Sequence, residues 1–364
     1  MSRVEAVVRV LRAALVVLVG LGVGPDAAAQ STGLDPDLRE GFEALEAWRY
    51  DQAREVASRI VQRGETDPVS LAYLATVKLN HGDYAGARDL FREAEAAGAP
   101  AFLLRDQSTA EATAEATEGY VETPTDRFVL RHPPGRDAIL VPFAEATLER
   151  ALSALSPLLG FEPEARTLVE IYPSAQTLAQ VSTLTADDIR NSGTIALCKW
   201  NRLMITSPRG VVFGYAWRDT LAHEFAHLLI GGASKNTAPI WLHEGLAKYV
   251  ETAWRGDVGE GISVEQQERL QEAARSGSLI PFSRMHPSMA KLPTQEQTSL
   301  AFAEVFTFIE FLVQKREWVG IQRLLAALGD GASVEAAMKT VYGRSFAELE
   351  RGWKRWQKKR PVRV

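Results

Sequence analysis

Two histidines separated by three residues constrain this chain more than any other feature of its sequence. Residues 222–227 read AHEFAH, so His223 and His227 are four positions apart. On an α-helix such residues lie on one face, one turn from each other, and two imidazoles placed so can bind one zinc ion. Glu224 is rotated by about 100° from His223, toward a water held by the metal. The segment therefore predicts a helix, a metal site and a glutamate general base.

A catalytic zinc site needs a third protein ligand, and the sequence offers few. A second helix is expected over residues 239–251, after the glycine-containing linker 231–235 lets the chain reverse. His243 and Glu244 are adjacent on this helix and point about 100° apart, so only one of them should face the metal. Geometry alone does not choose between them. The candidate third ligands are Cys198, His243, Glu244, Glu251 and His286.

The segments HEFAH and WLHEGLAKYVE together resemble the gluzincin zinc peptidases, specifically the bacterial peptidase MA-like proteins. The resemblance extends over most of residues 126–358. It implies a zincin-like fold with Zn²⁺ held by His223, His227 and Glu244, where 16 residues separate His227 from Glu244. It also implies that His243 is a neighbour of the site and not a ligand.

Two positions depart from the pattern of these peptidases. Thermolysin-like relatives carry a carboxylate one turn after the glutamate ligand, where it orients a metal-bound histidine, but this chain has Lys248 there. Glu251 is the substitute candidate, and a solvated surface glutamate is the alternative. The relatives also stabilise the oxyanion with a tyrosine or histidine, yet Phe302 stands where a tyrosine often opens a helix. The remaining oxyanion candidates are Tyr215, Tyr249, His286 and Tyr342.

The order of strands followed by helices over residues 125–360 predicts an α+β domain. The resemblance implies that this domain is zincin-like, with a small mixed sheet before the helices. The strand at 202–206 is expected to pair with extended substrate, as edge strands do. Cys198 lies in the apolar strand before it, where a buried free thiol is ordinary. Strands are expected at 127–131, 167–172, 194–198 and 202–206, with a helix at 143–159 and mostly helices after Trp217.

Residues 34–104 contain a repeat with a period of 34 residues. WRYDQA at 48–53 aligns with GDYAGA at 82–87, and the order of aromatic, small and proline positions resembles the tetratricopeptide repeat. Such α-helical repeats imply a groove for a protein partner, although so few repeats are equally expected to pack against a neighbour. Residues 105–124, which include STAEATAEATEG, are expected to form a linker or an exposed helix before a boundary near Pro124.

Residues 1–29 have the features of a secretory signal. Arginines precede an apolar run of 12 residues, and AAAQ at 27–30 supplies an A-x-A cleavage site. A membrane span needs about 20 residues, so we expect an exported, periplasmic or secreted chain without a stable span; an uncleaved anchor is the alternative. The single cysteine excludes an intramolecular disulfide, and the net charge of −5 does not argue for nucleic acid.

These features predict an exported zinc metallopeptidase that acts on a peptide or protein substrate. His223, His227 and Glu244 would hold Zn²⁺, and Glu224 would activate the metal-bound water. The alternative is a peptidase-like protein with weak or no turnover that binds a partner through its repeats. The unassigned oxyanion donor favours this alternative, and the retained Glu224 opposes it. A zinc hydrolase of a non-peptide amide is the third candidate.

Overall fold

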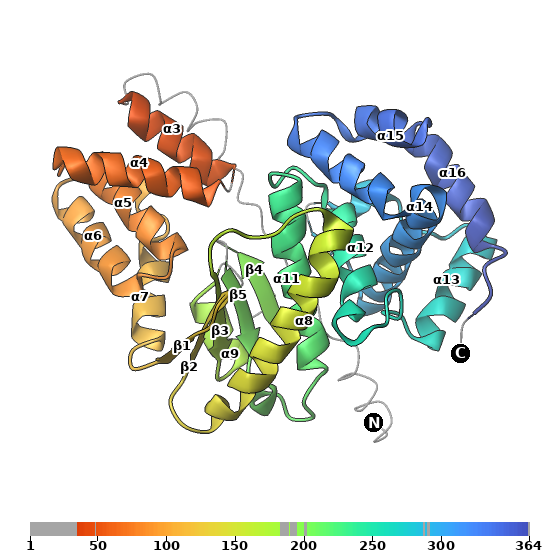
Figure 1. Ribbon diagram of the computed structural model, residues 1–364, viewed down its shortest axis with the longest axis horizontal. Helices are drawn as coiled ribbons and strands as arrows, with labels where there is room; N and C mark the ends of the chain where they lie inside the picture. The colour runs from red at the N-terminus through yellow and green to blue at the C-terminus, as the bar shows by residue number, and fades with distance from the viewer. Residues whose placement is uncertain are drawn as a thin grey trace.

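The computed structural model of the protein describes residues 35–47, 49–182, 189, 195–199, 202–286, 288–289 and 292–362. The predicted signal segment 1–29 and Trp48 lie outside these residues. Figure 1 shows a small sheet in the middle of the molecule, with the N-terminal helices, red to orange, on one side and the C-terminal helices, blue, on the other. No helix in the described part of the chain is both long and apolar enough to cross a membrane.

Four helices form the N-terminal part of the molecule. They are α3 (Pro36–Glu46), α4 (Tyr50–Arg63), α5 (Pro68–Asn80) and α6 (Tyr84–Ala96). Positions related by the 34-residue period are equivalent in them: Tyr50 and Tyr84 each begin a helix and are buried, as are Ala53 and Ala87 one turn later. This part is helical as predicted, and its identity as tetratricopeptide repeats stays a prediction.

A five-stranded mixed sheet follows, with the strand order β1-β2-β3-β5-β4. Strands β2, β3 and β5 run parallel, and each outer strand pairs antiparallel with its neighbour. One expectation is wrong: the strand at 202–206 is β5, which pairs with β3 on one side and β4 on the other, so the sheet edge belongs to β4. The strands are β1 (Val121–Pro124), β2 (Phe128–His132), β3 (Thr167–Tyr172), β4 (Ala196–Lys199) and β5 (Arg202–Thr206).

Regular secondary structure also fills the predicted linker at 105–124. After the short turn η2 (Ala101–Leu103) it contains helix α7 (Gln107–Ala116) and strand β1. The helix corresponds to the alternative considered for this segment, but the sheet begins before the boundary expected near Pro124. Strand β1 is mostly exposed at the sheet edge, so it needs little of the apolar pattern by which strands are recognised. The division into domains stays a prediction.

A buried cluster of polar side chains joins α6 to the sheet. The Tyr84 hydroxyl donates a hydrogen bond to Glu170 Oε1 on β3 and accepts one from Arg202 Nη1 on β5. The same Arg202 atom lies 3.0 Å from Glu170 Oε2, which also accepts from the Tyr172 hydroxyl at 2.9 Å. Glu170 and Arg202 are fully buried. Buried ion pairs depend on such additional hydrogen bonds, so Tyr84 on α6 stabilises the ion pair between strands β3 and β5.

Helices cover the sheet and form most of the remaining chain. Helix α8 (Val141–Leu159) connects β2 to β3, packs against α11 (Trp217–Ala233), and ends at Gly160, whose φ of 74° is the left-handed conformation that glycine adopts readily. One apolar core links the sheet, α8, α11, α12 and α14. The remaining helices and turns are η3 (Arg136–Leu140), α9 (Ala175–Gln180), η4 (Pro208–Gly210), α12 (Ile240–Val250), η5 (Ala253–Arg255), α13 (Val264–Ser276), η6 (Phe282–Met285), α14 (Gln295–Gly329), α15 (Val334–Tyr342) and α16 (Phe346–Gln357).

Candidate metal centre

Helices α11 and α12 bring two histidines and a glutamate to one point. His223 Nε2 and His227 Nε2 lie 3.1 Å apart, and each lies 3.7 Å from Glu244 Oε2. All three side chains are buried. A tetrahedral zinc ion with ligands at about 2.0–2.1 Å holds them about 3.3 Å from one another. Glu244 Oε2 has no hydrogen-bond partner among the described residues, so the donor atoms, their spacing and their burial all fit such an ion.

A glycine next to Glu244 sets the position of α12. A Cβ atom on Gly245 would lie 2.9 Å from Ile309 Cγ1 and 3.0 Å from the Val305 carbonyl oxygen. Because real Cβ contacts are rarely so short, only glycine lets α12 lie this close to α14. Glu244 is rotated by about 100° from that packing face, and its carboxylate meets the two histidines of α11.

Glu251 contacts the first histidine. His223 Nδ1 lies 3.0 Å from Glu251 Oε2, and Lys248 Nζ forms an ion pair with Glu251 Oε1. Burial favours the neutral carboxyl, but Lys248 and His223 outweigh it and lower the pKa of Glu251. Burial also opposes a charged His223, yet Glu244 and Glu251 outweigh it and raise the pKa of that imidazole to about 9. Glu251 is thus the substitute partner expected from the sequence and not a solvated surface glutamate.

His243 contacts the second histidine. The Nδ1 atoms of His227 and His243 lie 3.3 Å apart. Burial lowers the pKa of His243 to about 4, so its ring is neutral and one nitrogen can accept a hydrogen bond. When Nε2 of a neutral His227 ring faces the metal position, its Nδ1 carries the proton and donates a hydrogen bond to His243 Nδ1. The sequence placed His243 beside the site, but the relative rotation of two helices, which decides this contact, is not readable from spacing.

Glu224 lies beside the group of His223, His227 and Glu244. It is fully buried, and neither carboxylate oxygen has a hydrogen-bond partner among the described residues. Burial raises the pKa of Glu224 to about 8, with Glu244 adding to the rise and His223 opposing it. Helix α11, which carries Glu224, packs against the outer strand β4. A cation held by the three donors would lower the pKa of Glu224 from this raised value, so Glu224 is suited to accept and release a proton near neutral pH.

The other predicted ligand candidates lie apart from this group. Cys198 is buried in the apolar core, and burial followed by Glu224 raises the pKa of its thiol well above the ordinary value. His286 is exposed. Neither belongs to the cluster of described residues that could hold a metal, which consists of His223, His227 and Glu244.

The oxyanion candidates differ in their surroundings. Phe302 is part of the apolar core, Tyr249 packs against the Phe306 ring at 5.1 Å, and the Tyr342 hydroxyl is buried without a hydrogen-bond partner among the described residues. The Tyr215 hydroxyl donates a hydrogen bond to the Thr206 carbonyl oxygen at the end of β5. Burial, followed by the charge of Glu224, raises the pKa of Tyr215. Among these oxyanion candidates, Tyr215 is the one whose pKa the charge of Glu224 raises.

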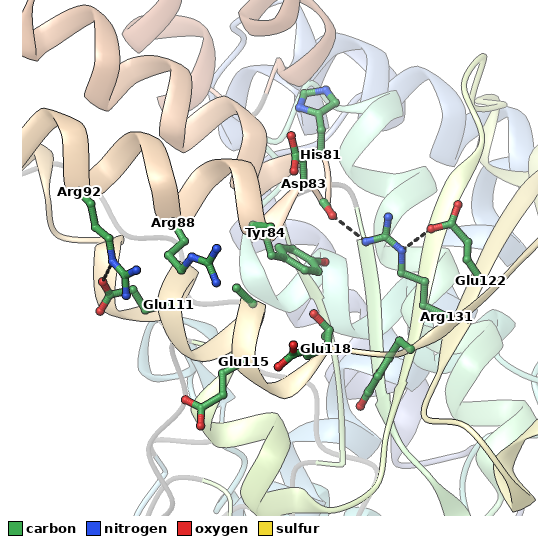
Figure 2. A pocket seen from close by; sticks show the side chains of 15 residues that line it. His81, Asp83, Tyr84, Arg88, Arg92, Glu111, Glu115, Glu118, Glu122 and Arg131 are labelled. Carbon is green, nitrogen blue, oxygen red and sulfur yellow. Dashed lines mark hydrogen bonds and ion pairs between the residues drawn. The ribbon is translucent and has the colours of Figure 1, made fainter.

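A cavity of about 950 Å³ lies elsewhere, between α6, α7 and strands β1 and β2 (Figure 2). Charged side chains from both sides line it and pair with one another: Arg92 with Glu111 at 3.0 Å, and Arg131 with Glu122 at 2.8 Å. Arg131 also donates to the Gly82 carbonyl at 2.7 Å. No residue of the metal-binding cluster lines the cavity, so it belongs to the junction between α6 and the sheet.

Comparisons with known proteins place the chain in a superfamily. No curated protein matches this chain. A mutant of a two-domain M1 zinc metallopeptidase bound to L-arginine is similar in structure, with 18% identity and a TM-score of 0.39 over 67% of this chain. The match spans about half of that protein, 52% of its chain, and is too distant to argue from. The family model of the Peptidase MA superfamily matches residues 147–359, which contain α11 and α12. Since that match covers more than half of the 364 residues, the chain belongs to the Peptidase MA superfamily.

Proposed function

We propose that this protein is a zinc-dependent peptidase of the gluzincin type, with His223, His227 and Glu244 as the metal ligands and Glu224 as the general base. One observation carries the proposal. Three buried donor atoms lie 3.1–3.7 Å apart, beside a buried glutamate whose carboxylate makes no hydrogen bond within the described residues. Two imidazole nitrogens and one carboxylate are the ligand set of catalytic zinc sites that keep a position open.

Each side chain has a chemical role in this proposal. A zinc ion bound there would act as a Lewis acid on the substrate carbonyl and lower the pKa of water toward about 7. Glu224 accepts a proton from the attacking water and returns it to the leaving amine. Glu251 and His243 hold the two imidazoles in the tautomer that turns Nε2 toward the metal. Substrate in extended form would pair with β4, the outer strand of the sheet among the described residues, in place of the β5 edge expected from the sequence.

Activity of the Glu224→Gln variant tests the catalytic assignment. The amide has nearly the same shape and cannot accept a proton, so we expect at least about a hundredfold loss of peptide hydrolysis with zinc content unchanged. Glu304→Gln is the matched control, because Glu304 is also fully buried and burial likewise raises its pKa to about 8. If a broad peptide library is cleaved equally by wild type and Glu224→Gln, the assignment is wrong.

Zinc content tests the ligand set independently of turnover. Glu244→Ala should lose most of the bound metal in purified protein, whereas Cys198→Ala should retain it. Metal retained in Glu244→Ala would overturn the ligand assignment.

The second candidate function is binding without turnover. It is favoured by Phe302, which fills the core where relatives often have a tyrosine. Zinc bound normally by a wild type that cleaves neither peptides nor other amides would establish it. Export of the chain, and a protein partner for the N-terminal helices, rest on sequence alone and belong to the proposal.

A further inference from the structure

Four large apolar side chains are exposed on two short segments, at 139–143 and 211–214. The exposed fractions are 66% for Ile139, 49% for Phe143, 91% for Val212 and 62% for Phe213. Single apolar residues on a surface are ordinary, but a contiguous group marks a site of interaction. We refer to these four side chains as the apolar tip.

Contacts on both sides of the 211–214 turn hold it along η3 and the start of α8. Before the turn, Arg209 Nη1 lies 2.8 Å from Asp137 Oδ1 on η3. After it, Arg218 Nε donates to Thr147 Oγ1 at 2.7 Å, and the Arg218 guanidinium lies 6.0 Å from the centre of the Phe143 ring. The turn that carries Val212 and Phe213 is therefore anchored on both sides to residues 137–147, which carry Ile139 and Phe143.

Basic and aromatic side chains border the apolar tip. Arg136 and Arg209 are exposed, and the Arg218 guanidinium lies 4.2 Å from the centre of the Trp254 ring. Arginines at such a border attract anionic lipid headgroups, and tryptophan favours the boundary between water and hydrocarbon. Two acidic groups at this border have partners: Asp137 is buried against Arg209, and Asp219 accepts a hydrogen bond from Trp254 Nε1 at 2.7 Å and lies 3.4 Å from Arg255 Nε. The charges of Arg136 and Arg218 add to these pairs.

The shape of the tip favours a lipid surface over a protein partner. Val212 is almost fully exposed on the turn, and none of the four apolar residues lines the cavity between α6, α7 and strands β1 and β2. A protruding apolar side chain needs a complementary pocket on a protein, whereas a bilayer accepts it without one. We propose that the apolar tip inserts into the surface of an anionic lipid bilayer, with Arg136, Arg209 and Arg218 at the headgroups. This inference does not depend on the proposed peptidase activity.

Sedimentation with lipid vesicles tests this proposal. The chain from Gln30 onward, which keeps every described residue, is mixed with phosphatidylglycerol vesicles and separately with phosphatidylcholine vesicles. We expect binding to phosphatidylglycerol that weakens with salt, and weaker binding to phosphatidylcholine. The double variant Val212→Ser/Phe213→Ser should bind at least about tenfold less. Val61→Ser is the matched control, because Val61 on α4 is 62% exposed and lies outside the tip; it should bind as wild type.

Three outcomes would overturn the proposal. The first is no binding to phosphatidylglycerol vesicles, and the second is equal binding by wild type and the double variant. The third is self-association of the lipid-free chain, seen by light scattering, that the double variant abolishes while vesicle binding stays unchanged. That result would assign the tip to a second copy of the chain. Circular dichroism of the double variant, expected to equal that of wild type, separates lost binding from lost folding.

Discussion

Replacing Tyr84 by phenylalanine tests whether the N-terminal helices and the sheet fold as one unit. The substitution keeps the buried ring and removes the hydroxyl that donates to Glu170 and accepts from Arg202. Both partners are charged and fully buried, and a hydrogen bond to a charged group contributes about 1.5–3 kcal/mol. The remaining ion pair keeps its 3.0 Å contact, so the loss is partial. We expect the free energy of unfolding to fall by about 2–4 kcal/mol.

Tyr73 provides the matched control for this change. It is fully buried in the N-terminal helices, and its hydroxyl donates to the Ala53 carbonyl at 2.6 Å. That acceptor is neutral and belongs to the same helical part. Tyr73→Phe should therefore cost about 0.5–1.5 kcal/mol, the usual contribution of a neutral hydrogen bond.

Urea titration measures both variants. Tryptophan fluorescence and far-ultraviolet circular dichroism should show one coincident transition in wild type, with an unchanged slope in each variant. A loss for Tyr84→Phe no larger than that for Tyr73→Phe would refute the reasoning about the buried charges. Two separate transitions in wild type would show that the helices and the sheet unfold independently.

Three further changes probe single contacts. Glu251→Gln should weaken zinc binding by about 10–100-fold, because an amide orients His223 less firmly than a carboxylate. Competition with a chromophoric chelator measures the zinc affinity, and an unchanged affinity would contradict the assigned hydrogen bond. His243→Phe should weaken zinc binding about tenfold by removing the acceptor of His227 Nδ1, and wild-type affinity in the same titration would show that the contact is dispensable. Glu304→Gln should stabilise the protein at pH 8. Burial raises the pKa of Glu304 from 4.5 to about 8. Below pH 4.5 the carboxyl is protonated in both the folded and the unfolded protein, so it does not change stability with pH there. Between pH 4.5 and 8 the unfolded protein loses this proton more readily, so the stability of the wild type falls as pH rises. The gain should be on the order of 2–4 kcal/mol at pH 8 and absent at pH 4, and a difference independent of pH would contradict the shift.

Local spacing was sufficient to predict the core of the candidate site. His223 and His227 share a helix, so the helical period alone places both rings on one face. Glu244 required the family resemblance, because the linker at 231–235 permits many helix orientations and leaves His243 equally eligible. The structure shows why both matter: Glu244 completes the cluster, while His243 contacts His227 from the side.

Sheet order was the part that the sequence did not reveal. Strands were expected at the positions of both β4 and β5, but which of the two is the outer strand depends on where β3 docks. Strand β1 was missed for a related reason, since its exposed residues and terminal proline carry little strand signal. Arg202 reads as a polar residue that opens a strand, and only the packing of α6 shows that it is buried against Tyr84.

The Tyr84 cluster also shows that the family match and the folded sheet begin at different residues. The family match begins at residue 147, whereas the sheet begins at Val121 and its buried ion pair is completed from α6. A fragment that begins at residue 147 would lack β1 and β2 and would expose the edge of β3 that pairs with β2. It would also leave Glu170 and Arg202 without the hydroxyl of Tyr84. In this chain α6 completes the buried ion pair of the sheet through Tyr84, so a change in that helix reaches strands β3 and β5.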